Sequence, residues 1–223
     1  MNTVIPSRSP HNVSQSCYTD FSEVLRPRDF SELTIPDSQI ERLKKAALSR
    51  EIPNLILYGS FGTGKTSCAN LLSQDETFHS LVLNCALDIT KKDVRSLVEP
   101  FATAASIFGR PKIIVLDEAE FIPAPAQTSL RGLIEKTIYR VRFIFTCNSI
   151  DKIDKAIRSR CVSICFDSLS TQRESYLKKV TRTVMSRLHE LQLTADESAV
   201  FEIVRQTYPD LRQIAKRIEF ELL

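Results

Sequence analysis

The segment Gly59-Ser60-Phe61-Gly62-Thr63-Gly64-Lys65-Thr66 decides how the rest of this 223-residue chain is interpreted. It matches the phosphate-binding pattern G-x-x-x-x-G-K-[ST] in full. An apolar run, Leu55–Tyr58, precedes it, and a segment with helical character, Thr66–Leu72, follows it. In such a loop the backbone N–H groups hold phosphate oxygens at the N-terminus of the helix. The motif in this context predicts a nucleotide site.

The side chains of this loop have separate expected roles. We expect Lys65 to reach the β- and γ-phosphates and the Thr66 hydroxyl to bind Mg²⁺. A chance glycine-rich turn is the alternative, but the chain has only five glycines and three of them lie here. We therefore predict ATP and Mg²⁺ as cofactors. The predicted nucleotide contacts of the loop are Gly59, Ser60, Phe61, Gly62, Thr63, Gly64, Lys65, Thr66 and Ser67.

Two further strands end in polar residues. Ile113–Leu116 is wholly apolar and is followed by Asp117 and Glu118. Ligands of open α/β sheets bind at the carboxyl ends of the strands, so Asp117 is expected to hold Mg²⁺ and Glu118 to polarise the attacking water. Surface acids at a strand end are the alternative. The strand that begins at Val141 ends in Thr146-Cys147-Asn148, where Asn148 is either a γ-phosphate contact or a turn residue.

The chain alternates between short apolar runs and amphipathic segments. This alternation predicts an α/β fold with a mainly parallel sheet, followed by a small helical domain. The predicted domains are a flexible leader (1–20), an α/β domain (21–167) and a helical lid (168–223). Strands are expected at 55–58, 81–83, 113–116, 141–145 and 161–166. Helices are expected at 38–50 with Ser38 as a possible cap, 66–72, 92–106, 127–137, about 170–190, 196–207, and 209–222 with Pro209 in its first turn.

Composition excludes several classes of protein. Hydrophobic residues make up 43% and charged residues 26% of the chain, which are ordinary globular values. There is no apolar run of the roughly 18 residues that a membrane span needs and no apolar core of signal-peptide length at the N-terminus. The six cysteines form no C-x-x-C pair, so reduced, partly buried thiols are expected. We predict an intracellular protein with no membrane partner.

The loop, the Asp117-Glu118 strand end, the strand ending at Asn148 and then Ser159-Arg160-Cys161 together resemble an AAA+ ATPase. Ser-Arg-Cys at this position is typical of sliding-clamp loaders, namely replication factor C small subunits and the loader subunits of T-even-type phages. The resemblance runs from about Phe21 to the C-terminus. Other matching segments are Leu25–Phe30, Ile52–Gly59, Asp93–Arg95, Phe101–Ser106, Gln127–Arg131 with Glu135, and Pro209–Arg212.

The resemblance implies roles that the spacing alone does not assign. Arg160 resembles the arginine finger that reaches the γ-phosphate of a neighbouring subunit, although the alternative is a surface arginine in a basic stretch. A guanidinium suits that role because it is permanently charged and donates parallel hydrogen bonds. Arg212 resembles the lid arginine that senses the same phosphate within its own subunit, and Asn148 the sensor on the adjacent strand. Arg26 and Pro27 resemble part of the adenine-side wall.

The function implied is ATP-dependent opening of a sliding clamp and its loading onto primer–template DNA. The implied partners are the clamp, DNA bound through its phosphates, and other loader subunits in a pentameric ring. Lys91–Arg95 and the basic residues after Glu120 are candidate DNA contacts. The location would be cytoplasm or nucleoid in a phage or prokaryotic system and nucleus in a eukaryote.

Two alternatives stay open. One is another AAA+ DNA-remodelling or transposition-regulating ATPase, which Ser159-Arg160-Cys161 disfavours. The other is an ATP-bound structural subunit of a loader, which is disfavoured by the intact Lys65, Asp117, Glu118 and Arg160.

The sequence departs from the family pattern in two places. Glu120 stands where the family usually has a shorter aspartate. Family members continue into a helical collar, whereas this sequence ends at Leu223. Either the sequence is a piece of a longer protein, or the subunits assemble through another surface.

Overall fold

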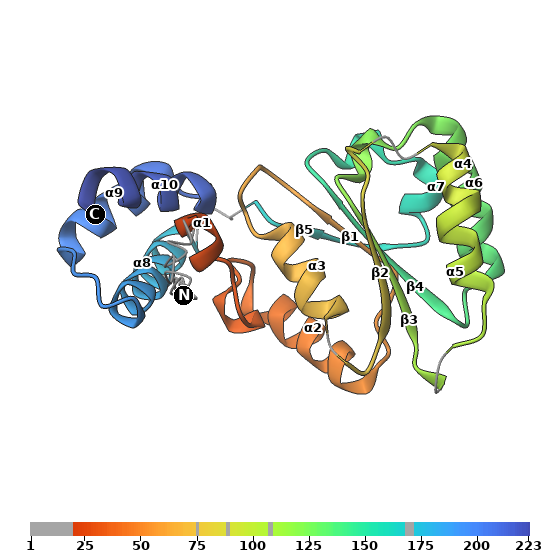
Figure 1. Ribbon diagram of the computed structural model, residues 1–223, viewed down its shortest axis with the longest axis horizontal. Coiled ribbons are helices and arrows are strands. Elements are labelled where there is room, and N and C mark those ends of the chain that lie inside the picture. Colours follow the sequence, from red (N-terminus) through yellow and green to blue (C-terminus); the bar gives the residue numbers. More distant parts are fainter. Residues whose placement is uncertain (1–19, 75, 88–89, 107–108, 168–171) are drawn as a thin grey trace, which may run out of the picture.

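The computed structural model describes residues 20–74, 76–87, 90–106, 109–167 and 172–223. Five strands form one all-parallel sheet in the order β2-β3-β4-β1-β5. The predicted α/β fold with a mainly parallel sheet is confirmed (Figure 1). Each expected strand is present, with ends that shift by at most two residues. The strands are β1 (Leu55–Tyr58), β2 (His79–Asn84), β3 (Lys112–Asp117), β4 (Val141–Cys147) and β5 (Val162–Cys165).

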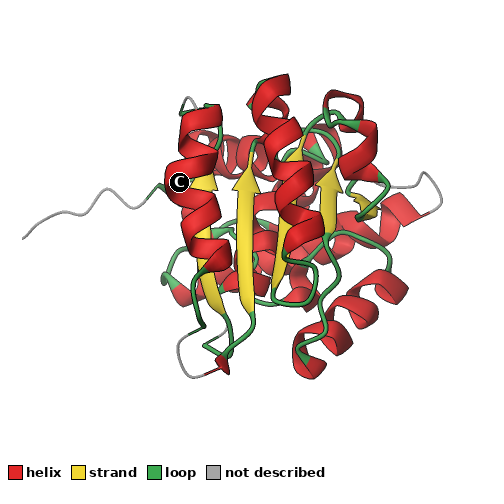
Figure 2. Cartoon of the chain, turned by 90° about the vertical axis from the view of Figure 1, so that its right-hand side faces the viewer, coloured by secondary structure: helices red, strands yellow, loops and turns green. Residues whose placement is uncertain are grey.

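Helices cover both faces of this sheet, so the central residues of its inner strands are largely apolar (Figures 1 and 2). Residues 113–116 of β3 are at most 1% exposed, as are residues 143–145 of β4. One face carries α2 (Asp37–Ser49) and α3 (Lys65–Ser73), and the opposite face carries α4 (Lys91–Asp93), α5 (Glu99–Thr103), α6 (Ala124–Lys136) and α7 (Lys155–Arg158). Because β1 lies between β4 and β5, the segment after β1 leaves from an interior strand of the sheet.

A separate helical unit lies beside the sheet. Its core is formed by α8 (Arg173–Glu190), α9 (Glu197–Thr207) and α10 (Leu211–Leu222). The short helix α1 (Phe21–Val24) also belongs to it, since Phe21 and Leu25 are buried among lid side chains. The expected boundary assigned these residues to the α/β domain. The packing attaches the start of the described chain to the lid instead, because Phe21 and Leu25 bury their side chains there.

The helix expected at 92–106 is wrong in its form. It is a chain of three short pieces, in which a π-helical stretch, Val94–Val98, separates α4 from α5 and the helix ends at Thr103. Pro100 has no N–H and therefore leaves an i→i−4 hydrogen bond unmade. At the end of the π-helical stretch, the N–H of the following Glu99 donates to the carbonyl of Val94, five residues earlier.

Three predicted helix starts also differ from the structure. Helix α6 begins at Ala124, three residues before the predicted start at Gln127. Helix α2 begins at Asp37, and Ser38 does not cap it, because the Pro36 carbonyl accepts the N–H groups of Gln39 and Ile40. Helix α10 begins at Leu211, so Pro209 lies outside it. The Asp210 carboxylate caps this helix by accepting the N–H groups of residues 212 and 213 at 3.0 and 3.1 Å.

The five described cysteines are free thiols, as expected, and Cys68, Cys85 and Cys147 are buried. Cys161, expected inside the last strand, lies one residue before it. No helix in the described part of the chain is long and apolar enough to cross a bilayer. The expected leader, apart from Asp20, lies outside the described residues.

Candidate nucleotide site

The predicted site lies at the carboxyl ends of β1, β3 and β4, facing the helical unit. The parallel pairing brings the ends of these strands to one edge, where a cleft separates the sheet from the lid. Asp117 lies beside this cleft, where its carboxylate accepts a hydrogen bond from Thr66. The predicted residues that line the cleft are Arg26, Pro27, Phe61, Gly62, Thr63, Gly64, Lys65, Thr66, Ser67, Glu118, Asn148 and Arg212.

The loop after β1 has a backbone suited to an anion. Gly59, Gly62 and Gly64 all have positive φ, at 142°, 71° and 93°, which L side chains rarely adopt. Gly64 is the N-cap of α3 and supplies no side-chain hydrogen bond there. Among the described residues, the N–H groups of Gly62, Thr63 and Gly64 donate to no protein group. These donors and the positive end of the α3 dipole can therefore bind phosphate oxygens.

Lys65 lies across the loop and is 8% exposed. Its ammonium donates to the carbonyls of Gly59 and Ser60 at 2.8 and 2.7 Å and to Asn148 Oδ1 at 3.1 Å. Burial lowers the pKa of Lys65, and the negative charge of Glu120 opposes that shift. Neutral oxygens thus hold the Lys65 ammonium at the loop, and phosphate oxygens can replace them.

Asp117 and Glu118 leave the end of β3 in different directions. Asp117 Oδ1 accepts a hydrogen bond from the Thr66 hydroxyl at 2.9 Å and another from the Thr146 hydroxyl. Glu118 has a left-handed backbone, with φ 56° and ψ 42°, and its N–H donates to Thr146 Oγ1 at 3.0 Å. Among the described residues no protein group hydrogen-bonds to the Glu118 carboxylate, which lines the cleft.

This arrangement fits a Mg²⁺ ion. A hydroxyl and a carboxylate oxygen lie 2.9 Å apart beside the phosphate loop, and Mg²⁺ prefers such oxygen ligands. No cluster of three metal-ligating side chains occurs in the described ranges. Thr66 and Asp117 are the residues that would hold Mg²⁺.

Asn148 is oriented by Glu120. Glu120 Oε1 accepts the Asn148 backbone N–H at 3.0 Å and also the Asn148 side-chain amide. The other Glu120 oxygen is buried and has no partner among the described groups. A continuous chain of hydrogen bonds thus runs from Glu120 through Asn148 to Lys65. The residue that departs from the family pattern therefore takes part in the site.

Two contacts anchor the phosphate loop to the rest of the molecule. Asp167, just after β5, accepts the Ser60 N–H at 2.7 Å. On the lid side, the Leu211 N–H donates to the Gly62 carbonyl at 3.0 Å. A Cβ at Gly62 would lie 2.1 Å from Asp210 Oδ1, so a side chain is excluded there. The loop and the start of α10 are in direct contact.

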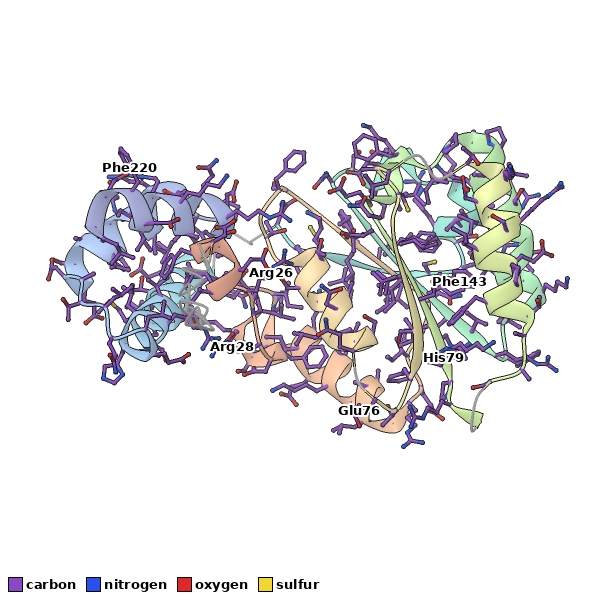
Figure 3. The ribbon with its side chains drawn as sticks, viewed as in Figure 1. Arg26, Arg28, Glu76, His79, Phe143 and Phe220 are labelled. Atoms are coloured by element: carbon purple, nitrogen blue, oxygen red, sulfur yellow. The ribbon has the colours of Figure 1, made fainter. Side chains whose placement is uncertain are left out.

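The two arginines of the lid side reach the cleft from different elements. Arg212 lines it from the first turn of α10. Arg26 lines it from the segment after α1 and is paired with Glu23, which raises the Arg26 pKa. Figure 3 shows Arg26 between the helical unit and the unit that contains the sheet. Pro27 follows it in the wall of the cleft.

Arg160 does not line this cleft. It follows α7, where its guanidinium pairs with Glu135 of α6 and donates to the Ala156 carbonyl at 2.6 Å. Both partners of this ion pair are partly exposed, with side chains at 35% and 53%. Arg160 is therefore on the surface and away from the phosphate loop of its own chain.

Three residues that order the site have no role that the sequence alone predicts, namely Glu120, Thr146 and Asp167. A signal was present for each. Thr146 lies on β4, two residues before Asn148, which directly follows the strand. Glu120 lies just beyond Glu118, and Asp167 follows a strand end at the same edge. Their partners come from other strands, and single-strand patterns do not identify those partners.

Comparisons with known proteins agree with this geometry. The sequence profile of the ATPase family associated with various cellular activities (AAA) matches residues 55–169. A solved structure of a Thermotoga maritima RuvB variant aligns with a TM-score of 0.68 at 17% identity, covering 88% of this chain and 66% of that chain. At such low identity this likeness shows a shared fold alone.

Curated relatives are more similar in sequence. Replication factor C subunit 5 of Mus musculus is 33% identical over 179 residues, which are 77% of this chain and 53% of that protein. The sliding-clamp-loader large subunit of Enterobacteria phage T4 is 33% identical over 195 residues, which are 84% of this chain and 60% of that protein. The chain thus spans between about half and three fifths of the length of these relatives.

Proposed function

Because the chain belongs to the AAA family of ATPases, we propose that it is an ATP-hydrolysing subunit of a sliding-clamp loader. The observation that carries the proposal is the cleft, where the phosphate loop, Glu118 and Arg212 meet. Similarity to replication factor C subunits and to the phage clamp-loader subunit supports the clamp-loading part.

The loop and lid are proposed to hold ATP. The free N–H groups of residues 62–64 and the Lys65 ammonium would bind the phosphates, with Lys65 leaving the carbonyls that it contacts now. Arg212 would contact the γ-phosphate from the lid. Arg26 and Pro27 would wall the base, since they lie on the lid side of the cleft.

Glu118 is proposed as the group that polarises water. Its carboxylate faces the cleft and is free of protein partners among the described residues, so it can accept a proton or orient a water. Mg²⁺, when bound, neutralises charge on the β- and γ-phosphate oxygens. Thr66 and Asp117 would position it, and Asn148, held by Glu120, would orient the γ-phosphate or the water.

Arg160 is proposed to act on the nucleotide of a neighbouring subunit. Its position outside its own cleft supports a role in trans. A partly exposed pair with Glu135 is weak, so a γ-phosphate across an interface can compete for the guanidinium. The proposed partners are other loader subunits in a ring, the sliding clamp, and the phosphates of primer–template DNA. A replication role places the protein where DNA is copied, in the cytoplasm or the nucleus.

The test is steady-state ATP hydrolysis with and without primed DNA and the sliding clamp from the same source. We expect both additions to stimulate turnover, and Glu118→Gln to lower turnover by about 100-fold or more while ATP still binds. Glu219→Gln, an exposed change on α10, is the matched control. Equal turnover in Glu118→Gln and wild type would refute the catalytic assignment. If clamp and DNA do not change ATP turnover, the protein is still an ATPase but the clamp-loading role is refuted.

If Arg160 acts in trans, ATP turnover should depend on protein concentration. Turnover per subunit should rise with protein concentration in the wild type, because the finger comes from a neighbour. Arg160→Ala should abolish that rise without weakening ATP binding. Fast turnover at high dilution, independent of concentration, would contradict the proposal.

A further inference from the structure

Thr146 lies at the end of β4, beside the two carboxylates after β3, and is 2% exposed. Its hydroxyl donates to Asp117 Oδ1 and accepts the Glu118 N–H at 3.0 Å. A threonine hydroxyl has one proton to donate and lone pairs to accept with, so both bonds form at once. One buried side chain therefore contacts both acidic residues of the site.

The hydrogen bond from the Glu118 N–H to the Thr146 hydroxyl supports an unfavourable backbone conformation of Glu118. A left-handed conformation is unfavourable for a non-glycine residue because Cβ crowds the following carbonyl, and Glu118 adopts it with φ 56°. This turn sends Asp117 and Glu118 in different directions. The Thr146 hydroxyl receives the N–H that the turn exposes, and without it this part-buried donor would lose its partner.

The contact with Asp117 selects one orientation of the carboxylate. Oδ1 accepts both hydroxyls, from Thr66 on one side and Thr146 on the other. Among the described residues no protein group donates to Oδ2, which leaves that oxygen available to an ion. With Thr146 absent, a single hydrogen bond to Thr66 would allow the carboxylate to rotate.

We propose that Thr146 is a positioning residue, which orients Asp117 toward Mg²⁺ and Glu118 toward the attacking water. The inference rests on the proposed function and adds to it a buried residue that acts through the two carboxylates. Mutation of a group that orients a metal ligand typically lowers metal affinity or activity by about 10- to 100-fold.

The experiment compares Thr146→Val, which keeps the shape and removes the hydroxyl, with Thr146→Ser, which keeps the hydroxyl. Binding of a fluorescent ADP is titrated in EDTA and at increasing Mg²⁺. We expect Thr146→Val to bind ADP in EDTA within about twofold of wild type but to need about tenfold more Mg²⁺ for tight binding. Turnover should also fall about tenfold or more, and Thr146→Ser should restore both to within about threefold.

Several outcomes decide the matter. A wild-type Mg²⁺ requirement in Thr146→Val, or equal defects in the valine and serine variants, would overturn the proposal. If Thr146→Val does not bind ADP in EDTA, Thr146→Ala provides the second hydroxyl-free variant, and the same Mg²⁺ titration judges it. If the wild type hydrolyses no ATP, the proposed function fails, whereas the Mg²⁺ titration still tests Thr146.

Discussion

At the scale of single residues, Glu120 has a larger part in the site than its position in the sequence indicates. It follows β3, yet its carboxylate holds Asn148 at the end of β4 through two N–H groups. A glutamate has one more methylene than an aspartate, which extends its reach to the neighbouring strand. The departure from the family pattern is therefore a contact inside the site.

We predict that Glu120→Ala lowers the free energy of unfolding by about 1–3 kcal/mol, because it leaves both N–H groups of Asn148 unpaired. Glu120→Gln keeps an acceptor oxygen and should cost less than half as much. Urea unfolding without nucleotide measures both. Equal losses in the two variants would mean that the hydrogen bonds to Asn148 contribute little.

At the scale of elements, the contact between the phosphate loop and α10 joins the site to the lid. Gly62 lies against Asp210, the residue that caps α10, and Arg212 follows in its first turn. The loop can approach this closely because Gly62 lacks a Cβ. The position of Arg212 therefore depends on a glycine in another part of the chain.

We predict that Gly62→Ala weakens ADP binding by about tenfold or more, because the new Cβ would lie 2.1 Å from Asp210 Oδ1 and displace the cap of α10. Gly109→Ala is the matched control. Its φ of 68° is similar, but a Cβ there meets no atom within 4 Å, so it carries the backbone strain alone. Fluorescent-ADP titrations measure the ADP affinity of both variants. The prediction fails if they bind alike.

Elements were predictable from local pattern wherever one face of a strand or helix is apolar. The errors fall at points where a neighbour sets the outcome. Pro100 interrupts the regular helix expected at 92–106, and Asp210 caps α10 so that Pro209 lies outside it. The carbonyl of Pro36, and not the side chain of Ser38, accepts the first N–H groups of α2. Gly132, inside α6, has open space around it and no contact that requires a glycine.

At the scale of the whole molecule, a group of ion pairs ties the segment before the sheet to the lid. Arg187 of α8 is 5% exposed and pairs with Glu32 at 2.7 Å and Glu190 at 3.1 Å, and it also donates to the Val24 carbonyl. This segment carries Arg26 and Pro27. The proposed adenine-side wall is thus fastened to the lid rather than to the sheet.

We predict that Arg187→Ala lowers the free energy of unfolding by about 3 kcal/mol, because Glu32 would keep only the Arg28 N–H and lose its ion-pair partner in a largely buried setting. Arg205→Ala, which removes an exposed pair with Glu202 on α9, should cause little change. Urea unfolding of the two variants compares them under one condition. Similar stabilities would show that the Arg187 cluster does not hold the segment.

The sequence by itself determined the chemistry of the site. The loop glycines, Lys65 and Thr66 stand at fixed spacing within one motif, and Asp117 and Glu118 are adjacent after one apolar run. Such local patterns are visible in a single sequence. The tertiary structure alone decided which groups orient them. Thr146, Glu120 and Asp167 act across strands, and residues 21–25 pack on a lid that begins more than 140 residues later. Such partners depend on the order of strands in the sheet and on long-range burial, which no local pattern encodes.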